Sequence, residues 1–187
     1  MTPGIGHNSG QADAPGHSWR RHVWTKARAD LLPKLPIEVI RLRVKRAAEL
    51  GLPYKTYAGV RASTGHDLVG FLFSSNALGV IRAGQLVPEK LDDLLNCDRV
   101  ALAHGASVLA ALKNAPTVDA AYAAPHFAQS WAATRDHLKA VLRARGTPAD
   151  RYLLIGDTAA ERGWAEAAQT AGYLNAAAFF DGQGVQG

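Results

Sequence analysis

The stretch LVGFLFSSNALG, residues 68–79, decides the fold class that we predict for this chain of 187 residues. Its first seven residues form a short apolar run of the kind found in strands that are buried on both faces. Four further runs of this kind follow, namely RVALAHG (99–105), TVDAAY (117–122), RYLLIG (151–156) and LNAAAFFD (174–181). The segments between them have helical character: VPEKLDDLL, SVLAALKN, SWAATRDHLKAVLRARG and AAERGWAEAAQTAG. This alternation predicts an α/β fold, in which a small, mostly parallel sheet carries helices on both faces.

Two helices are predicted immediately upstream of the first strand. Pro36 opens IEVIRLRVKRAAEL and Gly51 ends it, because proline suits the first helical position and glycine the left-handed stop. Pro53 opens YKTYAGVRAST, which we expect to end at Gly65. We therefore divide the chain into a disordered tail (1–18), a basic helical module (19–66), an α/β domain (67–182) and a short tail (183–187). The first tail is predicted from its Gly, Pro, Ser and Asn content, which offers almost no apolar anchor.

Charge is distributed unevenly along the chain. The net charge is +5, but residues 1–61 hold eleven basic and four acidic residues, and the remainder hold ten and twelve. Such an asymmetry points to a polyanionic partner. The single cysteine, Cys97, excludes a disulfide framework and any zinc site with two or more thiolates. A chain with one cysteine is typical of the reducing cytoplasm, which is the location we expect. The chain has no apolar run typical of a secretory signal or a membrane span, so we expect no membrane partner.

The two helices before the sheet resemble the helix-turn-helix unit of DNA-binding proteins. The resemblance rests on Ala47 four residues before Gly51, on Leu52 after the turn, and on the apolar Tyr57 and Val60. It implies that the second helix enters the major groove, while cations of the first helix contact phosphates. The nucleic-acid-binding residues predicted in this way are Arg41, Arg43, Lys45, Arg46, Tyr54, Lys55, Thr56 and Arg61. The alternative is a helical hairpin that supports the sheet and has a solvated basic face.

A second resemblance lies in RYLLIGDTAAERGWAEAAQTAGY, residues 151–173. A buried strand that ends in Gly-Asp, with an acid four residues after the Asp, is similar to the last motif of the haloacid dehalogenase-like phosphohydrolases. The resemblance covers residues 68–181 and implies that Asp157 and Glu161 hold Mg²⁺. It also implies a hydroxyl near Ser107 and a phosphate-balancing cation at Lys139 or Arg135.

The first motif of that family is not reproduced in this chain. The family has an Asp nucleophile and a second Asp two residues on, where this chain has Ser74 and Asn76. A carboxylate nucleophile forms the covalent phosphoaspartate, and a serine without an adjacent base is a poor substitute. The alternative is another doubly wound α/β fold, in which Asp157 or Thr158 simply caps the following helix. The expected ligand crevice contains Ser74, Asn76, Ser107 and Lys139, and we expect no catalytic residue and no cofactor.

The sequence therefore predicts a non-catalytic binding protein. Its basic module is expected to grip nucleic acid or another polyanion, and its α/β domain to bind a ligand or partner at the carboxyl ends of the strands. One alternative is a Mg²⁺-dependent haloacid dehalogenase-like phosphohydrolase that uses Asp157 and Glu161. The other is a protein-interaction subunit whose basic helices dock on an acidic partner.

Overall fold

The computed structural model describes residues 35–181, so both predicted tails and residues 19–34 lie outside the described part. The contacts divide the chain into two compact units, residues 1–40 and 41–187. In the described part of the first unit, the carbonyl oxygen of Pro36 accepts hydrogen bonds from the amides of Val39 and Ile40. Pro36 thus starts helix α2 (Ile37–Glu49), as the proline predicted.

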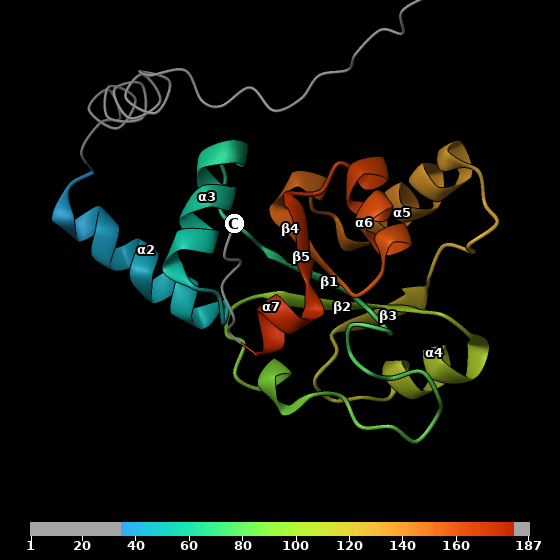
Figure 1. The fold of residues 1–187 in the computed structure, drawn as a ribbon. Helices are drawn as coiled ribbons and strands as arrows, with labels where there is room; N and C mark the ends of the chain where they lie inside the picture. Colours follow the sequence, from blue (N-terminus) through green and yellow to red (C-terminus); the bar gives the residue numbers. More distant parts are fainter. Residues whose placement is uncertain (1–34, 182–187) are drawn as a thin grey trace, which may run out of the picture. The chain divides into compact units, whose positions relative to one another are not determined.

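A five-stranded parallel sheet forms the centre of the second unit (Figure 1). Its strands are β1 (Gly70–Ser74), β2 (Asp98–Ala103), β3 (Ala120–Ala123), β4 (Tyr152–Gly156) and β5 (Gly172–Asn175). They lie in the order β3-β2-β1-β4-β5, and every neighbouring pair is parallel. The predicted α/β fold class is confirmed.

Two predicted elements differ from the structure. The last run was predicted as a strand over 174–181, but β5 ends at Asn175 and residues 176–180 form helix α7 (Ala176–Phe180). The side chain of Asn175 accepts a hydrogen bond from the amide of Ala177 at 2.9 Å, and this cap turns the chain from strand into helix. The segment VPEKLDDLL contains only a single turn of 3₁₀-helix, Glu89–Leu91. Its Leu91 and Leu94 are nevertheless buried.

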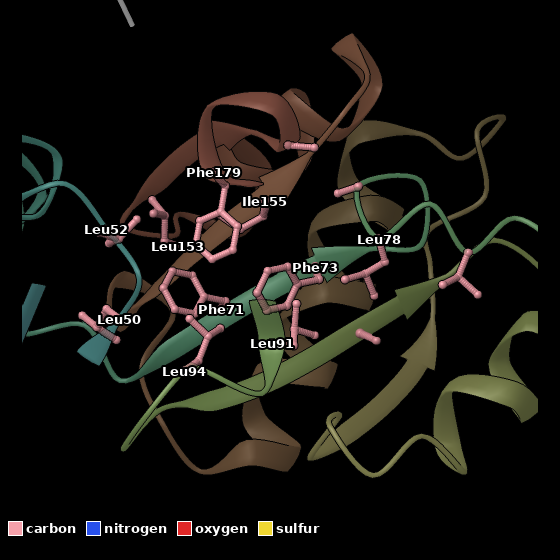
Figure 2. Packing of buried hydrophobic residues seen from close by; sticks show 14 of the residues in the cluster. Leu50, Leu52, Phe71, Phe73, Leu78, Leu91, Leu94, Leu153, Ile155 and Phe179 are labelled. Carbon is pink, nitrogen blue, oxygen red and sulfur yellow. The ribbon is translucent and has the colours of Figure 1, made fainter. Parts of the chain in front are cut away.

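Successive residues of the central strand face opposite sides of the sheet. Leu72 packs with residues of α5 (Trp131–Arg145) and α6 (Ala159–Ala168), so these two helices cover one face. Phe71 and Phe73 face the other side, where they pack with α4 (Ala106–Lys113), α7 and the segment 77–94 (Figure 2). β1 is buried along its whole length, as its continuous apolar run predicted.

The helical hairpin upstream of the sheet shares the core of the sheet. Gly51 has φ +62° and separates α2 from α3 (Tyr54–Thr64). Leu50, Leu52 and Tyr57 are almost fully buried, and they belong to the same apolar cluster as Phe71. Figure 2 shows Leu50 and Leu52 beside Phe71. The predicted boundary between residues 66 and 67 therefore falls inside the second unit.

Candidate functional site

The order of the strands creates a crevice at one end of the sheet. From β1 the chain proceeds to β2 and β3 on one side, whereas β4 and β5 lie on the other side. In open α/β sheets, ligands bind outside the carboxyl ends of the strands at such a reversal point. Here Ser74, Ser75 and Asn76 end or follow β1, and Asp157 and Thr158 follow β4. We call this place the switch-point crevice.

The carboxylate of Glu161 organises the switch-point crevice. Its side chain is fully buried. Oε1 accepts hydrogen bonds from Asn76 Nδ2 at 2.9 Å and His104 Nε2 at 3.0 Å. Oε2 accepts from the amides of Asp157 at 2.7 Å and Thr158 at 3.0 Å. The ends of β1, β2 and β4 are therefore tied together by a single acidic side chain.

The environment of Glu161 favours its ionised form. Burial by itself would raise the pKa of this carboxyl group, because a low-dielectric interior disfavours charge. Hydrogen bonds from His104, from the Asp157 amide and from the Ser74 hydroxyl outweigh this effect. The pKa of Glu161 is consequently lowered from 4.5 to about 2. Glu161 is therefore a buried anion in the crevice at neutral pH.

Thr158 and Glu161 also form a capping box at the start of α6. The Thr158 hydroxyl accepts a hydrogen bond from the Glu161 amide at 3.3 Å, while the Glu161 side chain accepts from the Thr158 amide. Of the two capping residues predicted as an alternative to a metal role, Thr158 is confirmed as the N-cap.

The serines of the crevice are closed off from solvent. Ser74 and Ser75 both have 0% exposure. The Ser74 hydroxyl accepts from the Ala77 amide at 3.0 Å, and the Ser75 hydroxyl accepts from the His104 amide at 3.1 Å. Both hydroxyls therefore brace the loop ends, and a group that attacks a substrate needs access that these two lack.

The predicted metal ligands occupy different environments. Glu161 uses both oxygens on hydrogen-bond donors, so a Mg²⁺ ion there would have to displace His104, Asn76 or the two amides. Asp157 is exposed at the rim of the crevice. Within residues 35–181, no group of three or more His, Cys, Asp or Glu side chains is arranged to hold a metal ion.

The remaining predicted crevice residues are separated. Ser107 is exposed in the first turn of α4, after the carboxyl end of β2. Lys139 lines a different hollow, of about 600 Å³, together with Gly146 and Pro148 of the loop that leads into β4. It therefore lies towards the amino end of that strand. Arg135, the other predicted cation, pairs with the adjacent Asp136 at 3.0 Å.

His104 is the crevice residue that sequence reasoning missed. It follows β2 directly, and its ring also packs on Trp164 of α6 with centroids 5.3 Å apart. The position of His104 in the sequence could have indicated its role, because a polar residue at the carboxyl end of a strand next to β1 faces the switch point. Only the pairing of β1 with both β2 and β4 brings His104 to Glu161.

Arg46, predicted to contact phosphate, is instead a structural clamp. Its Nε donates to Asp67 Oδ2 at 3.1 Å, and Nη1 donates to Glu49 Oε2 at 3.1 Å. Nη2 donates to the carbonyl oxygens of Leu68 at 2.9 Å and Asn96 at 3.1 Å. These partners precede β1 and β2, so the guanidinium holds α2 against the amino ends of two strands. The acceptors that surround Arg46 leave little of its guanidinium for a phosphate.

Arg61 is likewise engaged within the hairpin. Its Nη1 donates to the Tyr57 hydroxyl at 3.2 Å and lies 3.5 Å from Asp67 Oδ1. The other predicted nucleic-acid-binding residues, Arg41, Arg43, Lys45, Tyr54, Lys55 and Thr56, are exposed or partly exposed on α2 and α3. The pattern Ala47, Leu52 and Tyr57 that resembles a helix-turn-helix packs in the core shared with the sheet.

Comparisons of the chain with protein-family models, with curated proteins and with solved structures found no match. In the part of the chain that the structure describes, no helix is both long enough and apolar enough to cross a membrane.

Proposed function

We propose that this protein is a polyanion-binding protein in which α2 and α3 bind nucleic acid phosphates and the α/β domain binds a ligand without chemical conversion. The observation that carries the proposal is the exposure of Arg41 and Lys45, one turn apart on α2. Lys55 adds an exposed cation at the start of α3. These residues belong to the part of the chain that holds the excess positive charge, +7 over residues 1–61.

The switch-point crevice supports a binding role for the α/β domain. Ser74 and Asn76 stand where the resembled phosphohydrolases have carboxylates, and Ser74 is buried. Glu161 is saturated with hydrogen-bond donors. A group that attacks a substrate or accepts a proton has to be within reach of that substrate. The buried groups of the crevice hold the strand ends together, and we expect a ligand to bind at its rim.

The test is a salt titration of binding to a labelled DNA or RNA duplex, followed by fluorescence anisotropy. We expect the affinity of the wild type to fall steeply with salt, because phosphate contacts release counterions. The double variant Lys45→Glu/Lys55→Glu should bind at least about tenfold more weakly at low salt, and its log–log salt slope should be smaller by about 2.

A matched control has the same change in net charge elsewhere. Lys113→Glu/Arg143→Glu reverses two exposed cations on α4 and α5. We expect this variant to bind within about threefold of the wild type, because neither residue lies on α2 or α3. Equal weakening of both double variants would mean that only net charge matters. Absence of binding at low salt would overturn the proposal.

A Mg²⁺-dependent phosphohydrolase remains the second candidate, because Asp157 is exposed at the carboxyl end of β4. Its test is phosphate release from p-nitrophenyl phosphate with and without Mg²⁺. Release that depends on Mg²⁺ and disappears in Asp157→Asn would establish that reaction. A protein-interaction subunit is the third candidate, and a complex that survives nuclease and high salt would favour it over nucleic acid.

A further inference from the structure

A second concave site lies beside the switch-point crevice, between the carboxyl ends of β2 and β3. This hollow of about 510 Å³, here called the β2–β3 hollow, falls within the size range of small-molecule sites. Small and apolar residues form much of its wall, among them Ala103, Ala123 and Leu109. The polar side chains in the wall belong to His104 and His126. An apolar hollow with a few convergent polar groups is the usual form of a ligand site.

The hydrogen-bond partners of the two histidines assign their ring nitrogens. Glu161 is ionised and can only accept, so His104 Nε2 carries the hydrogen of their 3.0 Å contact. No hydrogen bond joins His104 Nδ1 to another described residue, so this nitrogen can bond a ligand. His126 Nδ1 accepts from the Ala128 amide at 3.2 Å, so its Nε2 carries a hydrogen. The hollow is therefore lined by two imidazole rings that each have a nitrogen able to bond a ligand, and the nitrogen of His126 is a donor.

An exposed aromatic ring completes the wall. Phe127 is 90% exposed, which is unusual for a large apolar side chain, and its ring packs on His126 with centroids 4.5 Å apart. The packing holds Phe127 at the hollow. A flat ligand ring placed there would cover apolar surface that water now covers, and it would stack on an aromatic face.

We propose that the β2–β3 hollow binds a planar heteroaromatic group such as a nucleobase, which stacks on Phe127 and exchanges hydrogen bonds with His104 and His126. Nucleobase edges carry donors and acceptors side by side, so they can bond these two ring nitrogens. Glu161 is a positioning residue for this site, because its hydrogen bond with Nε2 fixes the orientation of the His104 ring. The proposal deepens the ligand-binding role proposed for the α/β domain.

The site is separate from the basic helices. The clamp of Arg46 lies at Leu68 and Asn96, which precede β1 and β2, whereas the hollow lies beyond the carboxyl end of β2. Because β1 and β2 are parallel, these are opposite ends of the sheet. Loss of polyanion binding in Lys45→Glu/Lys55→Glu should therefore leave ligand binding in the hollow intact, and the two proposals fail independently.

The experiment uses the full chain with adenosine and cytidine as probes and ribose as the non-aromatic control. Binding is followed by calorimetry and by the imidazole NMR signals of His104 and His126. We expect both nucleosides to shift these signals and ribose to leave them unchanged. Phe127→Ala should weaken binding at least about fivefold, because it removes a stacking face. Leu86→Ala removes an equally exposed apolar side chain, 91% exposed, away from the hollow, and should bind as the wild type does.

Three results would overturn the proposal: no shift of either histidine with any nucleoside, unchanged affinity in Phe127→Ala, or equal binding of ribose. Phe127 is exposed, so its replacement leaves the fold intact, and the circular dichroism spectrum of the variant checks this. Phe127→Trp retains a stacking face and should restore the affinity that Phe127→Ala loses.

Discussion

The buried carboxylate of Glu161 is the residue on which the carboxyl end of the sheet depends. It joins loops that follow three strands, and donors surround both of its oxygens. Removing one partner of such a network leaves several donors buried without an acceptor, which costs more than the bond itself. The same network lowers the pKa of this group, so the stability of the fold is linked to pH.

We predict that this linkage appears below pH 5. A folded-state pKa of about 2 against 4.5 in the unfolded chain stabilises the fold by about 3 kcal/mol. Because the folded pKa is the lower one, this contribution is complete well above pH 4.5 and is lost as the pH falls towards 2. Urea unfolding at pH 7, 5, 3 and 2.5 should show a larger loss of unfolding free energy in the wild type than in Glu161→Gln.

Glu166→Gln is the control for this titration. It removes one exposed carboxylate from the same helix, and no hydrogen bond described here depends on it. Its unfolding free energy should follow the wild-type pH dependence. If Glu161→Gln also follows it, the buried network does not hold the charge as we describe.

Two glycines show how the same residue acts differently in a helix and in the central strand. Gly70 begins β1, where an added Cβ would overlap the backbone oxygen of Asp98 on the neighbouring strand. Asp98 cannot retreat easily, because Arg145 and Tyr152 both donate to its carboxylate. Gly59 lies within α3, exposed, and an added Cβ there would meet nothing within 4 Å.

We therefore predict opposite effects of the same substitution. Gly59→Ala should stabilise the protein by about 0.5–1 kcal/mol, because alanine loses less conformational freedom in a helix. Gly70→Ala should destabilise it by more than about 2 kcal/mol, since backbone of a central strand has to move. Thermal and urea unfolding of the two variants measure this, and destabilisation by Gly59→Ala would show that α3 is not helical at that position.

At the scale of the whole molecule, we expect the part of the hairpin from residue 41 onwards to unfold together with the sheet. Leu50, Leu52 and Tyr57 belong to the core that contains Phe71, and Arg46 binds carbonyl oxygens beside two strands. Elements that share a core usually unfold together. A helical module that folds independently of the sheet would instead unfold in a separate transition.

Arg46→Ala tests this cooperativity. We expect it to lower the unfolding free energy by about 2 kcal/mol and to speed hydrogen exchange of the β1 amides, because hydrogen bonds from a charged donor are lost. Lys45→Ala, at the adjacent exposed position, should change stability by no more than about 0.5 kcal/mol. Unfolding in two separate transitions, or unchanged exchange in β1, would show that the hairpin is an independent module.

The sequence alone was sufficient for the fold class, because its signals are local. Short apolar runs separated by helical segments predict a parallel sheet with helices on both faces, and Pro36 and Gly51 limit α2 at the predicted places. The role of Thr158 as a helix cap could also be predicted from the sequence, since a capping box spans only four residues. The end of β5 was misjudged, because LNAAAFFD satisfies both a strand and a capped helix over so few residues.

Only the tertiary structure decided which polar groups meet. Asn76, His104 and Glu161 are brought together by the order of the strands, and no pattern of spacing along the chain contains that order. Arg46 and Lys45 are adjacent cations in the sequence, yet one is engaged with backbone carbonyl oxygens and carboxylates while the other faces solvent. Charge and helical propensity are properties of the residue, whereas a partner at 3 Å is a property of the packed chain.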